Sequence, residues 1–354
     1  MDLVILVSLL NAGTLSIAIL GCLMFVSIPA YRGVCVLLSL VSVTSIANMF
    51  EDLQIFRELH LISPVFVLGY GPAFYFTVKR LIVGPVGHRM LWHFLPMLLL
   101  LPFSAYVQQV IAIGTLWRVF YALLTLLLII QFNQQLAARR SDVFDVSLSW
   151  LGWLIGVSTL FNALDLLRLN FQPDLPYEIN MLCYAASSVI FFVVLLLLIL
   201  ILNSRRAGLE TLAGSTNAEI FAFVDNTALN NKNLESPDEY QSLFVILDRE
   251  LRMQKWYCMP RLTLNQLSEL SGLSTRDISR CINLVAGISF NDFINQLRIE
   301  QIKRALMSDK KSNLTDLAFT VGFSSKAAFN QSFKKITGMT PSEFRGRSSP
   351  ESSF

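Results

Sequence analysis

Residues 189–202 read VIFFVVLLLLILIL, an apolar run without a single polar side chain. Together with the residues before it, this run can cross the hydrocarbon core of a bilayer, which needs about 20 apolar residues in a helix. Six similar runs precede it. The seven candidate spans are residues 4–28, 34–50, 65–83, 91–110, 117–136, 148–169 and 179–202. Residues 1–206 are therefore predicted to form a seven-helix transmembrane domain.

The composition supports this prediction and separates the chain into parts. Hydrophobic residues make up 54% of the chain and charged residues 15%, whereas soluble proteins have about 25% charged residues. A large buried helical core would need amphipathic helices to cover it, and we find none before residue 206. From residue 260 onward, however, the chain has 13 Lys and Arg but only 8 Asp and Glu. A basic segment of this kind suits a polyanionic partner.

The distribution of Lys and Arg predicts an orientation, because cytoplasmic connections carry more of them. With seven spans and a cytoplasmic C-terminal part, eight basic residues border the inner connections and three border the outer ones. The inner set is Arg32, Lys79, Arg80, Arg89, Arg139, Arg140, Arg205 and Arg206; the outer set is Arg57, Arg118 and Arg168. We predict a multi-pass protein of the bacterial inner (cytoplasmic) membrane with its N-terminus outside. The outer loops, one of them around residues 111–116, are too short for a soluble ligand domain.

Polar residues inside the sixth run are a candidate signal site. Asn162, Asp165 and Arg168 follow one another at intervals of three on one helical face. Ionisable groups at membrane depth are costly and mark functional positions by default. Two interpretations remain open: Asp165 and Arg168 form an ion pair near the outer interface, or the three residues bind a polar ligand. A small molecule or a membrane protein would then be the signal.

Residues 207–257 are predicted to link the two halves, beginning with a polar tether. Residues 238–257 carry apolar side chains at helical spacing, which predicts an amphipathic helix. This helix would lead into the C-terminal domain or join two chains in a homodimer. Residues 348–354 are predicted to be a disordered tail.

From residue 262 the sequence changes to short amphipathic helices separated by turn signals. Residues 262–283 read LTLNQLSELSGLSTRDISRCIN, which predicts helices over 264–271 and 275–284 around a tight turn, with Ser274 as the cap. A longer helix over 290–307 follows, capped by Ser289. The arrangement then repeats, with a helix over 314–321 and another over 325–336 capped by Ser324.

The second helix of each pair exposes side chains that suit DNA. A helix fits the major groove, where Arg bonds guanine, and Asn or Gln bonds adenine. The candidate base-reading residues are Arg276, Ser279, Arg280, Ser325, Lys326, Asn330 and Gln331. Lys334 and Lys335 are candidate phosphate contacts.

Residues 318–345 read AFTVGFSSKAAFNQSFKKITGMTPSEFR. This stretch resembles the signature of AraC/XylS-family transcriptional regulators, and residues 262–283 resemble the first helix-turn-helix of that family. The resemblance implies an AraC-type DNA-binding domain over 258–347, with two helix-turn-helix units joined by a central helix. Ala327 and Ala328 stand where the second recognition helix often carries polar side chains, so this helix is expected to make few contacts with bases. The soluble sugar-binding barrel usual in the family is absent.

These observations predict an all-α protein with a transmembrane bundle and a double helix-turn-helix domain. Its predicted function is that of a membrane-embedded one-component transcriptional regulator, with the bilayer and double-stranded promoter DNA as partners. The alternative is a membrane receptor or scaffold whose C-terminal domain binds a protein. We find no catalytic constellation, no phosphate-binding loop and no metal-ligand spacing, so no enzyme activity, metal or cofactor is predicted.

Overall fold

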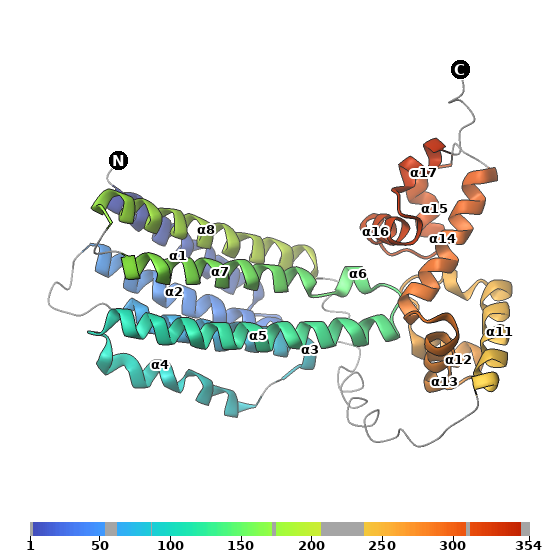
Figure 1. Cartoon of the computed structure of the whole chain (residues 1–354), viewed down its shortest axis with the longest axis horizontal. Helices are drawn as coiled ribbons and strands as arrows, with labels where there is room; N and C mark the ends of the chain where they lie inside the picture. Colours follow the sequence, from blue (N-terminus) through green and yellow to red (C-terminus); the bar gives the residue numbers. More distant parts are fainter. Residues whose placement is uncertain are drawn as a thin grey trace. The chain divides into compact units, whose positions relative to one another are not determined.

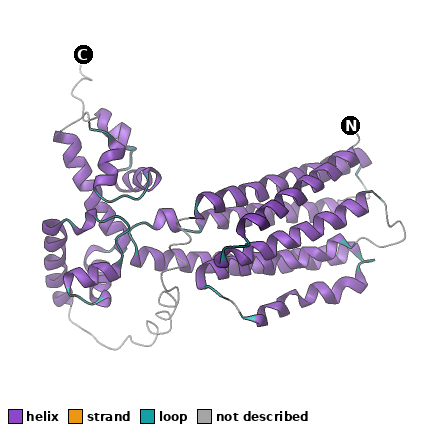
Figure 2. Cartoon of the chain, turned by 180° about the vertical axis from the view of Figure 1, so that it is seen from behind, coloured by secondary structure: helices purple, strands orange, loops and turns teal. Residues whose placement is uncertain are grey.

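The computed structural model describes residues 3–53, 62–85, 87–171, 175–206, 237–308 and 312–347. These residues form helices and no strand (Figure 2), apart from one isolated antiparallel bridge between Arg140 and Thr263. The predicted all-α class is therefore confirmed for the described residues. Contacts divide the chain into two compact units. The apolar unit comprises Met1–Gln131 and Leu148–Ala222, and the C-terminal unit comprises Phe132–Ser147 and Phe223–Phe354.

The apolar unit is a bundle of helices in which α1 packs against α2 and α8, α3 against α2, and α7 against α8. Its helices are α1 (Leu3–Phe25), α2 (Arg32–Asp52), α3 (Val67–Val83), α4 (Leu95–Leu100), α5 (Val107–Arg139), α7 (Ser149–Phe171) and α8 (Tyr177–Ser204) (Figure 1). Five helical stretches are long and apolar enough to cross a membrane: Leu3–Phe25, Pro29–Asp52, Val107–Arg139, Val143–Arg168 and Tyr177–Ser204.

The count of seven spanning helices is not confirmed. Helix α3 has only 17 residues. The run predicted over 91–110 is broken into a 3₁₀ helix (His88–Phe94), α4 and a second 3₁₀ helix (Leu101–Phe103). Pro stands at the start of α4 and of the second 3₁₀ helix, where its missing N–H interrupts the preceding hydrogen-bond pattern. The outer loop predicted around 111–116 is wrong, because these residues lie inside α5.

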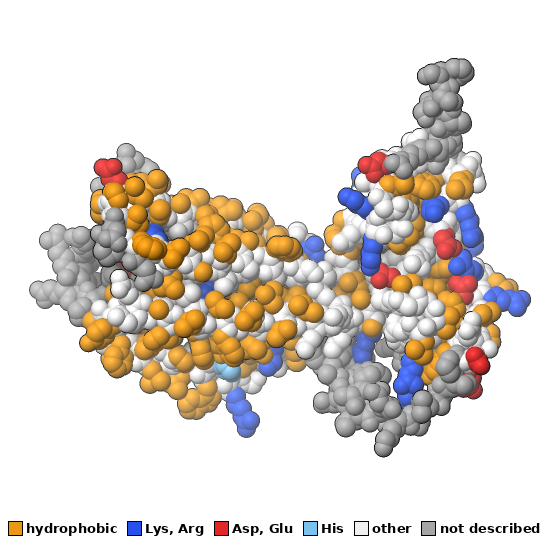
Figure 3. All heavy atoms as spheres, viewed as in Figure 1, with side chains coloured by type: hydrophobic (Ala, Val, Ile, Leu, Met, Phe, Trp, Pro, Cys, Tyr) orange, Lys and Arg blue, Asp and Glu red, His pale blue; other side chains and the backbone are white. Residues whose placement is uncertain are grey.

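Several polar side chains of this unit are buried, whereas many large apolar ones are exposed. On α1, Asn11 and Thr14 are buried, while Leu23 is 69% exposed. On α7, Trp153 is 78% exposed. Hydrophobic side chains cover most of the visible face of this unit (Figure 3). Such a surface is unfavourable in water and compatible with insertion into hydrocarbon.

The C-terminal unit contains two small apolar cores that share one helix. Its helices are α6 (Val143–Val146), α11 (Pro237–Gln254), α12 (Leu264–Ser271), α13 (Thr275–Cys281), α14 (Phe290–Ser308), α15 (Leu314–Thr320), α16 (Lys326–Thr337) and α17 (Pro341–Arg347). Phe293 and Leu297 of α14 belong to the first core, and Ile299 and Ile302 to the second. Because α14 contributes to both cores, it joins the two pairs of short helices.

Helix α11 packs on the first core through Tyr240, Leu247 and Leu251, as the lead-in interpretation predicted. The tether at 207–236 and the tail at 348–354 lie outside the described residues. The domain boundaries predicted after residues 206, 257 and 347 stay predictions.

Gly322 lies where the two cores meet and has a φ of +95°. A Cβ at this position would stand 2.5 Å from the carbonyl oxygen of Cys258, which belongs to the connection between α11 and α12. No side chain therefore fits between the second helix-turn-helix and this connection. Gly338 has a similar φ of +76°, but a Cβ there would meet nothing within 4 Å.

We predict that Gly322→Ala destabilises the C-terminal unit by about 3 kcal/mol, because the left-handed backbone and the backbone clash both oppose it. Gly338→Ala, which suffers only the backbone strain, should cost about 1 kcal/mol. Hydrogen exchange of the α14 amides in the full chain measures both changes. Equal effects of the two substitutions would contradict the close approach at Gly322.

Candidate nucleic-acid interface

The first helix-turn-helix is formed by α12, a left-handed turn at Gly272 and α13. The α12 helix starts with a capping box in which Thr263 and Gln266 satisfy each other's backbone N–H groups. Ser274 caps α13 as predicted, since its hydroxyl accepts the Asp277 N–H at 3.1 Å and donates to the Asp277 carboxylate at 2.6 Å. These caps fix the start of both helices, so the direction of the α13 N-terminus is well defined.

The predicted base-reading side chains of α13 differ in whether they bond another part of the unit. Arg276 and Ser279 are half-exposed on its outer side. Arg280 is also half-buried, and its Nη1 donates to the Tyr240 hydroxyl of α11 at 3.3 Å. Arg280 therefore links α13 to α11 in this structure, a contact that the sequence alone did not indicate.

The second helix-turn-helix is formed by α15 and α16, with Ser325 as the cap of α16. The cap predicted at Ser324 is wrong by one residue, because Ser325 has the extended backbone and its hydroxyl accepts the Ala328 N–H at 3.1 Å. Ala328 is buried in the second core, whereas Ala327 is exposed. Of the two alanines, Ala328 is therefore a packing position. The predicted contacts Lys326, Asn330, Gln331 and Lys334 are all exposed.

Two basic side chains on or beside this helix have partners within the unit. The Lys335 ammonium forms an ion pair of 2.6 Å with Asp292 of α14, so it is engaged in this structure. The Arg345 guanidinium donates to the Ser312 carbonyl at 2.6 Å and fixes the turn before α15. A groove of about 530 Å³ runs between α15, α16 and α17, with Lys326, Asn330 and Arg345 in its wall.

Arg298 of α14 is a buried residue that joins α14 to the connection between α11 and α12 through hydrogen bonds. Its side chain is only 1% exposed. Nε donates to the Tyr257 carbonyl at 2.7 Å, and Nη2 donates to the Met259 carbonyl at 2.8 Å. Nη1 donates to the Asn295 amide oxygen at 3.1 Å. Burial lowers the pKa of the Arg298 guanidinium to about 10, which leaves it charged at neutral pH.

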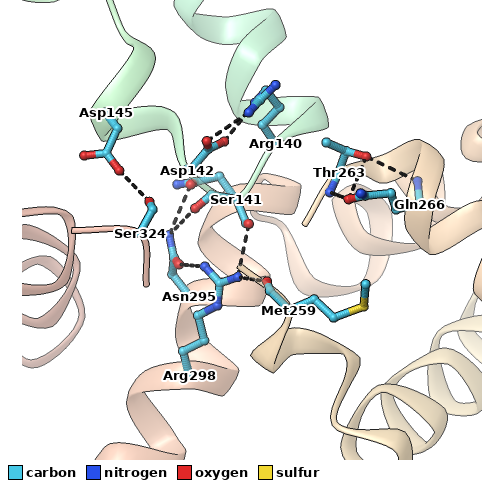
Figure 4. A network of polar contacts seen from close by, with 11 residues as sticks. Arg140, Ser141, Asp142, Asp145, Met259, Thr263, Gln266, Asn295, Arg298 and Ser324 are labelled. Carbon is cyan, nitrogen blue, oxygen red and sulfur yellow. Dashed lines mark hydrogen bonds and ion pairs between the residues drawn. The ribbon is translucent and has the colours of Figure 1, made fainter. Parts of the chain in front are cut away.

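A short segment between α5 and α7, residues 140–146, also contacts this network (Figure 4). We call it the docking segment. The Ser141 hydroxyl accepts from Arg298 Nη2 at 3.2 Å, and the Ser141 N–H donates to the Leu262 carbonyl at 3.0 Å. Arg140 binds the buried Asp142 carboxylate through two hydrogen bonds of 2.8 and 2.9 Å. The docking segment is thus bonded to α14 and to the residues just before α12.

The docking segment also reaches the start of the second recognition helix. The Asp145 carboxylate accepts hydrogen bonds from the hydroxyls of Ser324 and, at 2.7 Å, Ser325. Phe144 packs against the second core. A carboxylate therefore occupies the N-terminal end of α16, where the helix dipole favours a negative charge. The same helix N-terminus would attract a DNA phosphate.

The predicted signal site lies in the apolar unit, and only two of its three residues line a common cavity. Asn162 and Asp165 line a cavity of about 190 Å³, together with Arg118 of α5. The Arg168 guanidinium forms an ion pair of 2.8 Å with Asp165 and also donates to Asn180. The expected Asp165–Arg168 ion pair is thus present, while its position near the outer interface and the role of the three residues in signalling stay predictions. Arg118, which the sequence placed beside an outer loop, is buried within α5.

Comparison with known proteins agrees with this geometry. Residues 267–347 match a family described as a helix-turn-helix domain. Over 85 residues the chain is 39% identical to uncharacterized HTH-type transcriptional regulators of Staphylococcus aureus strains COL and MSSA476, covering 24% of this chain and 11% of each relative. Over 94 residues it is 32% identical to the bifunctional transcriptional activator/DNA repair enzyme AdaA of Bacillus subtilis strain 168, covering 27% of this chain and 44% of AdaA.

The chain thus spans less than half the length of these relatives. No solved structure matches it. The C-terminal part carries a helix-turn-helix domain, and the relatives support DNA binding in transcription regulation as its role.

We predict that Ser325→Ala destabilises the second helix-turn-helix by about 1 kcal/mol, because α16 loses its cap. Ser324→Ala should cost less, since it loses the bond to Asp145 but leaves the Ala328 N–H satisfied. Hydrogen exchange of the first α16 amides compares the two variants. A larger effect of Ser324→Ala would contradict the assignment of Ser325 as the cap.

Proposed function

We propose that the chain is a membrane-embedded one-component transcriptional regulator of the AraC type. It binds promoter DNA sequence-specifically through both helix-turn-helix units, in response to a signal received in or at the membrane. The observation that carries the proposal is one chain with two such units on a shared α14 and five helices able to span a bilayer. A DNA-binding unit attached to such helices has a direct route from a membrane event to a promoter.

The proposed contacts follow from exposure and chemistry. Arg276, Ser279, Lys326, Asn330 and Gln331 read base edges, and Lys334 binds phosphate. Three further candidates have a second role in this structure: Arg280 bonds Tyr240, Ser325 caps α16 and Lys335 pairs with Asp292. Contacts of Arg280 and Lys335 with DNA would require these bonds to open.

We place the protein in the bacterial inner membrane, with its N-terminus outside and its C-terminal unit in the cytoplasm. The excess of Lys and Arg near the proposed inner connections supports this orientation. The chromosome is reached only from that side. Two chains would present four helix-turn-helix units to a promoter, so a homodimer is the proposed binding form.

The docking segment is the proposed route of the signal. It follows α5 directly and precedes α7, and it bonds both α14 and the start of α16. A movement of α5 relative to α7 would displace the docking segment and, with it, the Asp145 carboxylate. Since this carboxylate repels DNA phosphates from the start of α16, its withdrawal would favour DNA binding.

The recognition helices are tested by charge reversal in the full chain, reconstituted in nanodiscs and incubated with fragments of the host genome. Arg276→Glu and Lys326→Glu should each weaken binding to the selected fragments by at least about tenfold, because each replaces a base or phosphate contact with a repulsion. Arg304→Glu makes the same charge change on α14, at a side chain that is 76% exposed, and should have a much smaller effect.

An alternative role is that of a membrane receptor or scaffold whose C-terminal unit binds a protein. Unchanged signalling in cells after both reversals, with no preference of the wild type for any genomic fragment over random DNA, would favour that role and refute the regulator.

Asp145→Asn tests the docking segment. It removes the negative charge from the start of α16 and should raise the affinity for the selected DNA by about threefold to tenfold at low salt, with less effect at high salt. Asp316→Asn removes an equal charge from an exposed position on α15, so it controls for the change in net charge. An affinity gain of the same size in both variants would show that Asp145 has no special position.

A further inference from the structure

Six helices of the apolar unit line the partly open cavity of about 190 Å³ introduced above: α1, α2, α3, α5, α7 and α8. Much of its wall is polar, although the surrounding bundle is built from apolar side chains. The polar wall includes Asn11, Thr44, Asn48, Asn162, Ser187 and Ser188. Some of these groups already have partners, since the Asn11 amide donates to Asp52 at 3.1 Å and the Thr44 and Ser188 hydroxyls donate to backbone carbonyls of their own helices. The other polar groups of the wall are available to a polar occupant.

Arg118 is the basic residue in the wall of this cavity, and its side chain is only 5% exposed. Its Nη2 donates to the Ser158 hydroxyl and, at 3.4 Å, to the Ser158 carbonyl of α7. Its guanidinium carbon lies 5.5 Å from the centre of the Tyr70 ring. Within the described residues, Nε and Nη1 have no hydrogen-bond partner and no carboxylate forms an ion pair with Arg118.

Asp165 is the acidic residue in the cavity wall, but its charge is already balanced. The Arg168 guanidinium binds the Asp165 carboxylate at 2.8 Å. The positive charge of Arg118 is therefore not neutralised by the described residues. A buried charge in this position is strongly unfavourable unless an anion pairs with it.

We propose that this cavity binds a small organic carboxylate, which accepts hydrogen bonds from the free Nε and Nη1 donors of Arg118. A dry cavity of about 150 Å³ holds benzene, so the space here suits a molecule of roughly six to ten non-hydrogen atoms. That is more room than one halide ion fills. The amides and hydroxyls of the wall suit a further polar substituent, such as the hydroxyl of a hydroxy acid or the amine of an amino acid.

The position of Arg118 gives the site a route to the docking segment. Arg118 lies on α5 and Ser158 on α7, the two helices that the docking segment joins in the sequence. A carboxylate on Arg118 changes the charge and the hydrogen bonds at the contact between these helices. The role of this ligand as the signal rests on the proposed function, whereas its binding does not.

The binding test uses the full chain in nanodiscs of phosphatidylethanolamine and phosphatidylglycerol. Thermal unfolding is measured with glycerate, lactate, 3-hydroxybutyrate, alanine or serine, and with chloride or phosphate at the same ionic strength. We expect a saturable rise of the midpoint with at least one of the five carboxylates and none with chloride. Stabilisation by chloride alone, or by none of the five, would overturn the proposal.

Variants then locate the binding. Arg118→Gln should weaken it by at least about tenfold, because the charge-assisted bonds are lost. Arg80→Gln is the matched control, since Arg80 of α3 lies outside the cavity wall and donates to the Pro29 carbonyl. If Arg118→Gln does not fold, Ser158→Ala keeps the arginine and should weaken binding by about threefold or more. Unchanged affinity in the folded Arg118 variant, or in Ser158→Ala where that variant does not fold, refutes the site.

A DNA-binding measurement on the same samples separates the two proposals. A chain that binds a carboxylate but no DNA refutes only the regulator, and one that binds DNA but no carboxylate refutes only the ligand site.

Discussion

The buried guanidinium of Arg298 is the interaction on which the C-terminal unit depends. It donates to the carbonyls of Tyr257 and Met259, which would otherwise lie without partners in the connection between α11 and α12. It also binds Ser141 of the docking segment. One side chain thus ties together three stretches of chain that are far apart in the sequence. Removing it would leave several buried acceptors unsatisfied, which costs more than the bonds themselves contribute.

Much of the C-terminal fold follows from local sequence signals. The helices around Gly272, the cap at Ser274 and the repeat near Ser325 depend on residues within a few positions of each other, so propensity and capping rules predict them. The bonds of Arg298 to Ser141 and of Asp145 to Ser324 join residues more than 150 positions apart. Nothing local marks such pairs. The docking segment therefore looked like an ordinary inner loop of the membrane domain.

In the apolar unit, the sequence predicted where hydrophobic helices lie but not the break in the run over 91–110 or the start of α5. The hydropathy pattern predicts that a span starts at Trp117 and that Arg118 borders an outer loop. The helix begins ten residues earlier, at Val107, because α4 is short and ends before it. The available signal was a single arginine inside a long apolar stretch, which is costly there and needs a partner. Hydropathy alone could not show which helix of the bundle supplies that partner.

The two polar sites of the chain share one covalent element. Helix α5 is continuous from Val107 to Arg139 and leads directly into the docking segment. At one end, the proposed carboxylate would alter the contact between Arg118 and Ser158. At the other end, a displacement of the docking segment need only exceed the reach of a hydrogen bond to release Ser324 and Ser325 from Asp145.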